Sequence, residues 1–328
     1  MASTVGNSSA KASKGQSLAQ DALKRFFRNP TAILGLSILS LIILMTIFAP
    51  LLRPGDPLKS NLKVRQLPPS WTMSQADLDK KKITAWTYPF GTDVQGRDLL
   101  MRVLYGGRIS LRAGLVAVIF SVSIGMVLGL VAGFFGGWID IVIVWLVDVL
   151  LAFPGILLAI ALASALGAGT LSFQLPFLPF AFELSSIEKA LIAISITQIP
   201  IFIRITRASV ISLRESEFVQ AAKSLGANPR RTMWLHVLPN GLSPILIQLT
   251  LSIGTVVLDM AALGFLGLGA QPPAPEWGAM ISDGFGRFRS APWLSIFPGL
   301  AIFLTVVGFN LLGDALRDVL DPRLKNVS

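Results

Sequence analysis

The sequence predicts an all-α integral membrane protein with six transmembrane helices. Of its 328 residues 53% are hydrophobic and only 14% are charged, and the mean hydropathy is +0.67. That composition is more apolar than a soluble core needs. A membrane-spanning helix requires about 20 apolar residues, and six runs without charged residues approach or exceed that length. The runs cover residues 29–52, 113–139, 149–182, 190–203, 237–258 and 290–313.

The chain begins with a polar segment rich in serine and alanine. Residues 1–28 contain no apolar stretch of their own and end with Lys24, Arg25 and Arg28. This pattern predicts a retained cytoplasmic tail before a first transmembrane helix at 29–52, and no cleaved signal peptide. Lysine and arginine are nearly balanced across the membrane until the long loop 53–108 is left out, and then they favour the inside for both termini.

Residues 53–108 are predicted to form a periplasmic loop that contains an interfacial helix. The loop is rich in proline, tryptophan and charge, and its Lys80–Lys82 run fits a solvated surface. Its last part, GTDVQGRDLLMRVLYGGR, separates apolar from basic positions as an amphipathic helix at the membrane interface does. The apolar positions are Leu99, Leu100, Val103 and Leu104, and the basic positions are Arg97 and Arg102.

Residues 109–316 are predicted to hold the other five transmembrane helices, before a cytoplasmic tail at 317–328. In the run 113–139, Ser121, Gly125, Gly129 and Gly133 recur every four residues. Small residues at this spacing allow helix backbones to approach closely in lipid, although the same stripe also fits a surface facing a substrate. The third run is interrupted at Gly167, Gly169 and Pro176, and the fourth, 190–203, is short.

A compact polar segment at 216–239 interrupts this apolar core. Ser216 can cap a first helix, and Gly226 suits the left-handed residue that closes it. Asn228 offers a second cap, followed by Pro229 at a first helical position, and Pro239 is expected to end this second helix. The apolar face of the first helix comprises Phe218, Ala221, Ala222 and Leu225. Two short helices with a sharp joint are suited to docking on a soluble partner.

The sequence offers little for catalysis. It contains one histidine, His236, no cysteine, and no GxxxxGK[ST], HExxH or GxSxG motif. We therefore predict no catalytic residue, no metal site and no cofactor in this chain, and an energy source outside it. The net charge of +10 does not indicate nucleic-acid binding, since the basic residues lie at membrane edges without interleaved aromatic residues.

Two acidic residues lie inside predicted transmembrane helices, each next to the end of one of the runs without charged residues. Asp148, about nine residues into the third helix, is expected near the middle of the membrane, and Asp259 toward the outer end of the fifth helix. An acid at the centre of a spanning helix costs roughly 2.5–3.5 kcal/mol, so each should find a partner or water. Both a contact with the translocation path and a polar clamp between helices fit these residues.

The segment 217–239 resembles the EAA loop of permease subunits in binding-protein-dependent ABC importers. The chain has Gln220 where that motif has glutamate and His236 where it has isoleucine. The matching positions are Ala221, Ala222, Gly226, Leu238 and Pro239. Residues 217–240 are similar to the form found in the dipeptide, oligopeptide and nickel group. Residues 90–111 and 264–280 resemble the C-type permease of that group, in which Asp259 is often glutamate. The resemblance extends over nearly the whole chain.

This resemblance implies a type I ABC importer permease fold in a bacterial inner membrane, with both termini cytoplasmic. A second homologous permease, two cytosolic ATPase subunits and an external solute-binding protein are the implied partners, and ATP and Mg²⁺ would be bound by the ATPases. The implied substrates are di- or oligopeptides, with glutathione, nickel chelates and peptide antibiotics as related possibilities. The implied ATPase-coupling residues are Glu217, Phe218, Ala221, Ala222, Leu225, Gly226, Leu238 and Pro239. A secondary transporter or channel subunit without ATPase partners is the alternative.

Overall fold

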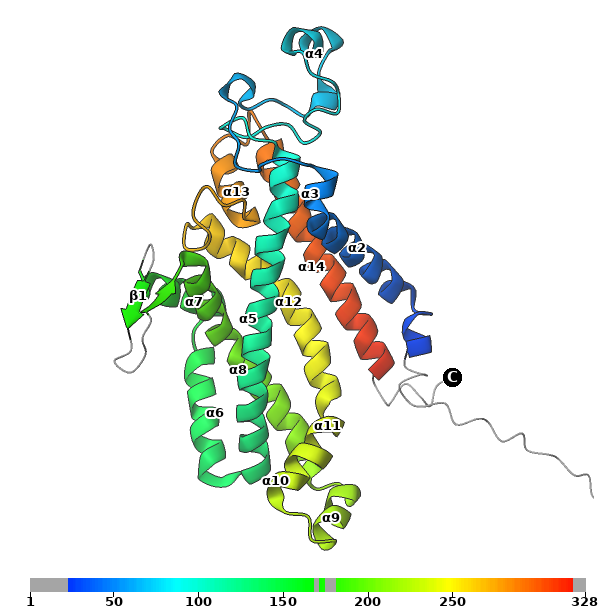
Figure 1. Ribbon diagram of the computed structural model, residues 1–328. Coiled ribbons are helices and arrows are strands. Elements are labelled where there is room, and N and C mark those ends of the chain that lie inside the picture. Colours follow the sequence, from blue (N-terminus) through cyan, green and yellow to red (C-terminus); the bar gives the residue numbers. More distant parts are fainter. Residues whose placement is uncertain (1–22, 168–170, 175–180, 321–328) are drawn as a thin grey trace, which may run out of the picture.

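Five long helices and one bent helix pair build the molecule (Figure 1). The computed structural model describes residues 23–167, 171–174 and 181–320. In this part of the chain, five helices are long and apolar enough to cross a membrane, and the bent pair α6 (Gly137–Leu151) and α7 (Gly155–Ala165) makes six when it is counted as one span. The five are α2 (Pro30–Ile47), α5 (Leu99–Phe135), α8 (Ser186–Arg214), α12 (Leu242–Phe265) and α14 (Trp293–Leu320).

The first helix forms where the sequence predicts it and packs beside the last one. Asn29 caps α2 by accepting a 2.9 Å hydrogen bond from the backbone N–H of Thr31, and a short α3 (Ala49–Leu52) follows. Arg108 of α5 donates to the carbonyl oxygens of Thr46 and Ile47 at 3.0 and 2.7 Å. These are orphan carbonyls at a helix end, which a basic side chain satisfies well.

The structure corrects the predicted interfacial helix. Leu99 begins α5, with Asp98 as its cap, and the helix then runs without a break to Phe135. The amphipathic segment is therefore the first part of a spanning helix, and the loop ends near residue 98. The basic side of the segment does not face solvent, because Arg97 and Arg102 are buried against Asp93. The loop before α5 contains η1 (Leu62–Val64), η2 (Ser70–Thr72) and α4 (Gln75–Lys81), where Lys80 and Lys81 are exposed.

The stripe of small residues on α5 packs against α8. A Cβ atom at Gly129 would lie 2.6 Å from the carbonyl oxygen of Ile203, and one at Gly133 would lie 2.9 Å from that of Arg207. Ser121 donates a 3.0 Å hydrogen bond to the carbonyl oxygen of Ser195. The backbones approach as closely as small residues at steps of four allow, which confirms the packing interpretation.

The third span differs from the prediction in its start and its break. It begins at Gly137, after a turn in which Gly136 and Gly137 both have positive φ. It breaks between Leu151 and Gly155, where the helix axis bends by 90°. Pro154 explains the break, because it lacks a backbone N–H and disfavours the helical conformation of the residue before it. Of the predicted break positions, Gly167 follows the end of α7 with φ +78°, whereas Gly169 and Pro176 lie outside the described residues.

The fourth span is longer than the short run 190–203 suggests. It is the 29-residue α8, which begins in a capping box formed by Ser185 and Glu188 and contains Pro200. An antiparallel hairpin of β1 (Leu171–Gln174) and β2 (Ala181–Leu184) precedes it, so the chain is mainly rather than entirely helical.

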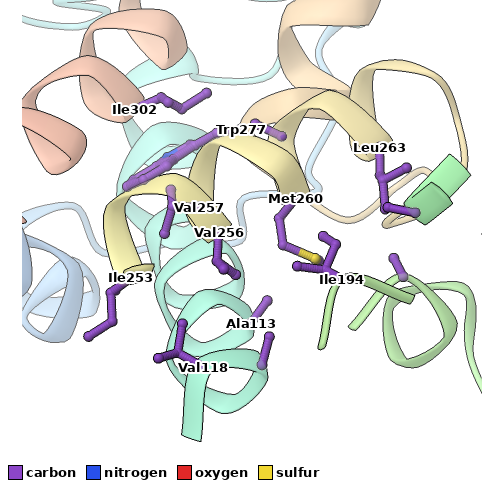
Figure 2. Packing of buried hydrophobic residues seen from close by; sticks show 14 of the residues in the cluster. Ala113, Val118, Ile194, Ile253, Val256, Val257, Met260, Leu263, Trp277 and Ile302 are labelled. Carbon is purple, nitrogen blue, oxygen red and sulfur yellow. The ribbon is translucent and has the colours of Figure 1, made fainter. Parts of the chain in front are cut away.

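The hydrophobic core lies where α12 crosses α5 and α8 (Figure 2). Val256 and Met260 of α12 point toward Ala113 of α5 and Ile194 of α8. Trp277 starts the short α13 (Trp277–Phe285) and is fully buried, with its indole N–H bonded to the carbonyl oxygen of Val103 at 2.9 Å. Because the indole N–H has this partner, burial of Trp277 leaves no unsatisfied hydrogen-bond donor on its side chain.

Candidate functional site

The polar segment at 216–239 forms a helix–turn–helix that projects from one end of the molecule, opposite the loop that holds α4 (Figure 1). Its first arm is α9 (Glu217–Ser224), and its second arm consists of α10 (Pro229–Arg231), the π-helix η3 (Thr232–Val237) and α11 (Leu238–Asn240). We call residues 216–240 the coupling loop.

The joint of the coupling loop has the predicted geometry. Gly226 adopts φ +84°, and the backbone N–H of Ala227 donates to the carbonyl oxygen of Ala222 at 3.0 Å. Asn228 caps the second arm by accepting a 2.7 Å hydrogen bond from the backbone N–H of Arg231. A glycine in the left-handed conformation followed at once by a new cap turns the chain sharply.

One predicted capping bond and one predicted helix end are wrong, although α9 begins at Glu217 as predicted. Ser216 stands at the cap position of α9, but its hydroxyl donates to the carbonyl oxygen of Leu213 at 2.6 Å and does not cap α9. Pro239 does not end the second arm, because it lies at the start of α11 and only Gly241 separates α11 from α12. The π-helix η3 ends at Val237, two residues before Pro239, and its wider turn accommodates a residue without an N–H.

A small apolar cluster fastens the coupling loop to the membrane helices. Val219 of α9 is fully buried and packs with Met233 and Val237 of the second arm. The same cluster includes Leu130 of α5 and Val210 of α8. Sequence analysis assigned the apolar face of α9 to Phe218 and its neighbours and missed Val219. Its spacing of three residues from Ala222 is the signal that could have identified a second apolar face.

The predicted contact face points away from this cluster and is available to a partner. Phe218 is 42% exposed and Leu225 is 89% exposed. Glu217 and Ala221 are also exposed, and Ala222 is half-buried. Leu238 is partly buried against the apolar cluster, so it supports the loop from within, whereas Pro239 is exposed. Phe218 and the C-cap residue Leu225 are seven residues apart and so lie on one face, about two turns from each other. Exposed apolar side chains arranged in this way are typical of a protein interaction surface.

The two intramembrane acids have different surroundings. Asp148 of α6 accepts a 2.6 Å hydrogen bond from the guanidinium of Arg204 on α8, and both side chains are more than half exposed. Nearby, Asp140 and Arg207 form a two-point ion pair between the same helices. Asp148 therefore joins helices as a polar clamp does. Asp259 is half-buried on α12 and interacts with the side-chain amide of Gln198 on α8, and no ion pair within the described residues includes it.

Buried charges lie at the opposite end of the molecule, and two of them, Asp93 and Glu276, were not among the residues predicted from the sequence. Asp93 pairs with Arg97 at 2.5 Å and with Arg102 at 3.4 Å. Glu276 is buried at the start of α13 and accepts 2.8 Å hydrogen bonds from the backbone N–H groups of Gly278 and Ala279. Burial raises the pKa of Glu276 against the opposing effect of these hydrogen bonds. Arg102 also donates to the carbonyl oxygens of Pro57 and Pro273 at 3.4 and 3.3 Å, so it links the loop to the segment that precedes α13.

Comparison with known protein families identifies the family of this chain. Residues 125–326 match the model of the family described as "Binding-protein-dependent transport system inner membrane component". The chain belongs to this family. Residues 17–69 in addition match the family described as "N-terminal TM domain of oligopeptide transport permease C". The chain is thus a membrane subunit of the permease class, as the resemblance at the coupling loop implied.

Individual relatives cover most of the chain. It is 46% identical over 307 residues to a dipeptide transport system permease protein DppC of Alkalihalophilus pseudofirmus, with 94% of this chain and 90% of the relative aligned. It is 39% identical over 300 residues to the DppC of Haemophilus influenzae, which aligns 92% and 93% of the two chains. A glutathione transport system permease protein GsiD of Escherichia coli O157:H7 is 47% identical over 236 residues, 72% of either chain.

A solved structure shares the fold. A chain of the MetNI methionine ABC transporter in an inward-facing conformation superposes with a TM-score of 0.52, covering 68% of this chain and 98% of that chain. The sequence identity is only 17%, so this likeness concerns the fold alone. It agrees with the type I importer permease fold that the resemblance implied.

Proposed function

We propose that this chain is a permease subunit of an ATP-driven importer that takes up di- or oligopeptides delivered by a solute-binding protein. One observation carries the coupling mechanism: α9 presents Phe218 and Leu225 to solvent while Val219 anchors the same helix in the apolar cluster. An exposed apolar face on a firmly seated helix suits a surface that an ATPase subunit grips and moves.

In this mechanism the chain itself hydrolyses no ATP. Two cytosolic ATPase subunits bind ATP and Mg²⁺, and the closure of the pair pushes on the coupling loop of this chain and on that of a second, homologous permease. The cluster around Val219 passes the displacement to α5 and α8, because Leu130 and Val210 belong to it. Movement of packed helices then switches the translocation path between inward and outward access.

The proposed orientation places the coupling loop and both termini in the bacterial cytoplasm and the loop with α4 in the periplasm. The arrangement of the helices supports it, since α9 and α4 lie at opposite ends of the molecule and the C-terminal end of α14 points away from α4 (Figure 1). The binding protein would then meet the outer cap formed by residues 53–98 and α13. The names of the similar permeases, dipeptide and glutathione transport, favour a small peptide as the substrate.

Purification of the affinity-tagged chain from its own cells in mild detergent tests this proposal. Two ATPase subunits with Walker motifs and a second permease are expected to purify with the tagged chain. The alternative of a secondary transporter or channel subunit predicts that no ATPase accompanies it, and that result would overturn the proposal.

The Ala222→Asp variant tests the contact itself. It introduces a charge at a half-buried position of α9, which costs at least about 1 kcal/mol when the charge is not paired. We expect normal membrane insertion, weaker retention of the ATPases and loss of peptide uptake. Full uptake with a normally assembled complex would show that this face does not dock.

A further inference from the structure

A row of polar side chains runs along one side of α12. Gln248, Ser252, Thr255 and Asp259 are spaced by four, three and four residues, which places them on one face of an α-helix. The neighbouring and opposite faces of α12 are apolar, and Val256, Val257 and Met260 are buried there in the core shown in Figure 2. We call the row of four the polar stripe.

The polar stripe is only partly covered by the chain itself. Thr255 is exposed, Gln248 and Asp259 are half-buried, and Ser252 is buried. The members satisfy one another in part, because the amide of Gln248 donates to the hydroxyl of Ser252 at 3.0 Å and the hydroxyl of Thr255 donates to the carbonyl oxygen of Ser252 at 3.0 Å. A stripe with one carboxylate on an otherwise apolar spanning helix is too costly to face lipid.

Asp259 carries the only ionisable group of α12. Its neighbour on α8, Gln198, is a neutral amide, and no ion pair among residues 23–167 and 181–320 involves Asp259. Asp148 and Asp140 differ in this respect, because each has an arginine of α8. No cationic side chain of the described residues is therefore placed to balance a charge on Asp259.

We propose that the polar stripe lines the route of the transported molecule and that Asp259 attracts the ammonium group of a passing peptide. This inference rests on the proposed function. Gln248, Thr255 and Gln198 offer neutral donors and acceptors that suit the amide groups of a peptide without holding it tightly. A carboxylate half-buried at a low-dielectric site concentrates cations along the route, while the absence of a fixed counter-ion leaves it free to act on each substrate.

Single-cysteine labelling tests the inference directly, because the chain contains no cysteine. In the assembled importer in native membranes, Thr255→Cys is treated with a cationic or an anionic methanethiosulfonate reagent, with and without ATP, and the label is read on this chain after separation. We expect labelling by both reagents. After correction for their rates with free cysteine, the cationic reagent should react roughly tenfold faster, and Asp259→Asn should abolish that preference.

A matched control is Leu44→Cys on α2, which is 51% exposed on an apolar helix face and should resist both water-soluble reagents. Failure to label Thr255→Cys in every state would show that lipid or the second permease covers the stripe. Equal labelling by both reagents would show that Asp259 is already neutralised, for example by a cation of the second permease. Either result overturns the inference and leaves the co-purification test of the proposed function untouched.

Transport gives a second measurement. In proteoliposomes containing the complete importer and its binding protein, Asp259→Asn should lower peptide uptake about tenfold, whereas Asp259→Glu, which keeps the charge, should retain most of it. ATP hydrolysis stimulated by the binding protein should persist in both variants, since the coupling loop is unchanged. Undiminished uptake by Asp259→Asn would refute the role of the carboxylate.

Discussion

Gly226 shows how a single residue sets the geometry of the coupling loop. Its φ of +84° lies in the region that side chains with a Cβ disfavour, yet a Cβ atom added there would meet nothing within 4 Å. The requirement for glycine therefore comes from the backbone conformation and not from crowding. The sequence could predict this position because a left-handed glycine at the end of a helix leaves a local signal.

The effect of substituting Gly226 should consequently depend on how readily the new residue adopts the left-handed conformation. Gly226→Val should cost at least about 1 kcal/mol at the joint and uncouple uptake from ATP hydrolysis in proteoliposomes. Gly226→Asn, which tolerates the left-handed conformation better, should behave almost as the wild type. Equal loss in both variants would mean that the space around the joint is filled in the complex.

Phe218 and Val219 are adjacent residues with opposite roles, and a pair of variants separates them. Val219→Ala removes part of the buried anchor and should destabilise the loop by about 1 kcal/mol, which limited proteolysis of the purified complex would detect as faster cleavage within 216–240. Phe218→Ala should leave proteolysis of the chain unchanged but reduce the amount of ATPase retained during purification. The reverse pattern would exchange the roles we assign.

At the level of elements, α5 and α8 form a pair that cannot be separated without cost. The carbonyl oxygens of α8 lie where side chains at Gly129 and Gly133 would begin, and Arg207 of the same face bonds to Asp140 of α6. The stripe of small residues made this packing predictable. The partner helix was not predictable, because spacing within one helix identifies a contact face but not the helix that occupies it.

The Gly129→Leu variant should therefore disrupt the packing of α5 against α8. The new Cβ would lie 2.6 Å from the carbonyl oxygen of Ile203, and we expect a loss of about 1–3 kcal/mol from overpacking, seen as a lower melting temperature of the detergent-purified complex. Gly155→Ala is the matched control. Nothing lies within 4 Å of a Cβ atom there, so its melting temperature should stay close to that of the wild type.

For the whole molecule, the proposed orientation makes a prediction that needs no partner subunit to be identified. Lys81 of α4 and Gln220 of α9 are both exposed, and these two helices lie at opposite ends of the molecule (Figure 1). In intact cells with a permeabilised outer membrane, an impermeant thiol reagent should label Lys81→Cys but not Gln220→Cys. Labelling of Gln220→Cys from outside would reverse the orientation and remove the coupling role.

The apolar runs predicted the number and order of the spans. Charged residues inside the spans, however, caused some boundaries to be predicted at the wrong residues. The run beginning at 149 misses the first half of the third span, because Asp140 and Asp148 interrupt it although each is paired with an arginine of α8. The arginines in these pairs, Arg204 and Arg207, lie within α8, so the run without charged residues ends at 203 although the helix continues to Arg214. Arg97 and Arg102 gave a surface pattern, yet both are buried in salt bridges with Asp93, four and nine residues earlier. Arg102 also donates to the carbonyl oxygens of Pro57 and Pro273, and sequence patterns do not reveal such distant partners.

The close packing of α5 along α8 also limits how the molecule can move. With 37 residues, α5 is about 55 Å long. It is seated beside the Val219 cluster near one end and clamps the first helix through Arg108 near the other. The backbones of α5 and α8 are too close to slide past each other, so the two helices rotate together as a rigid body. Because α5 is about 55 Å long, each degree by which it tilts about one end displaces its other end by about 1 Å. In the proposed orientation, a small displacement of the coupling loop in the cytoplasm would thus move the periplasmic end of α5 sideways.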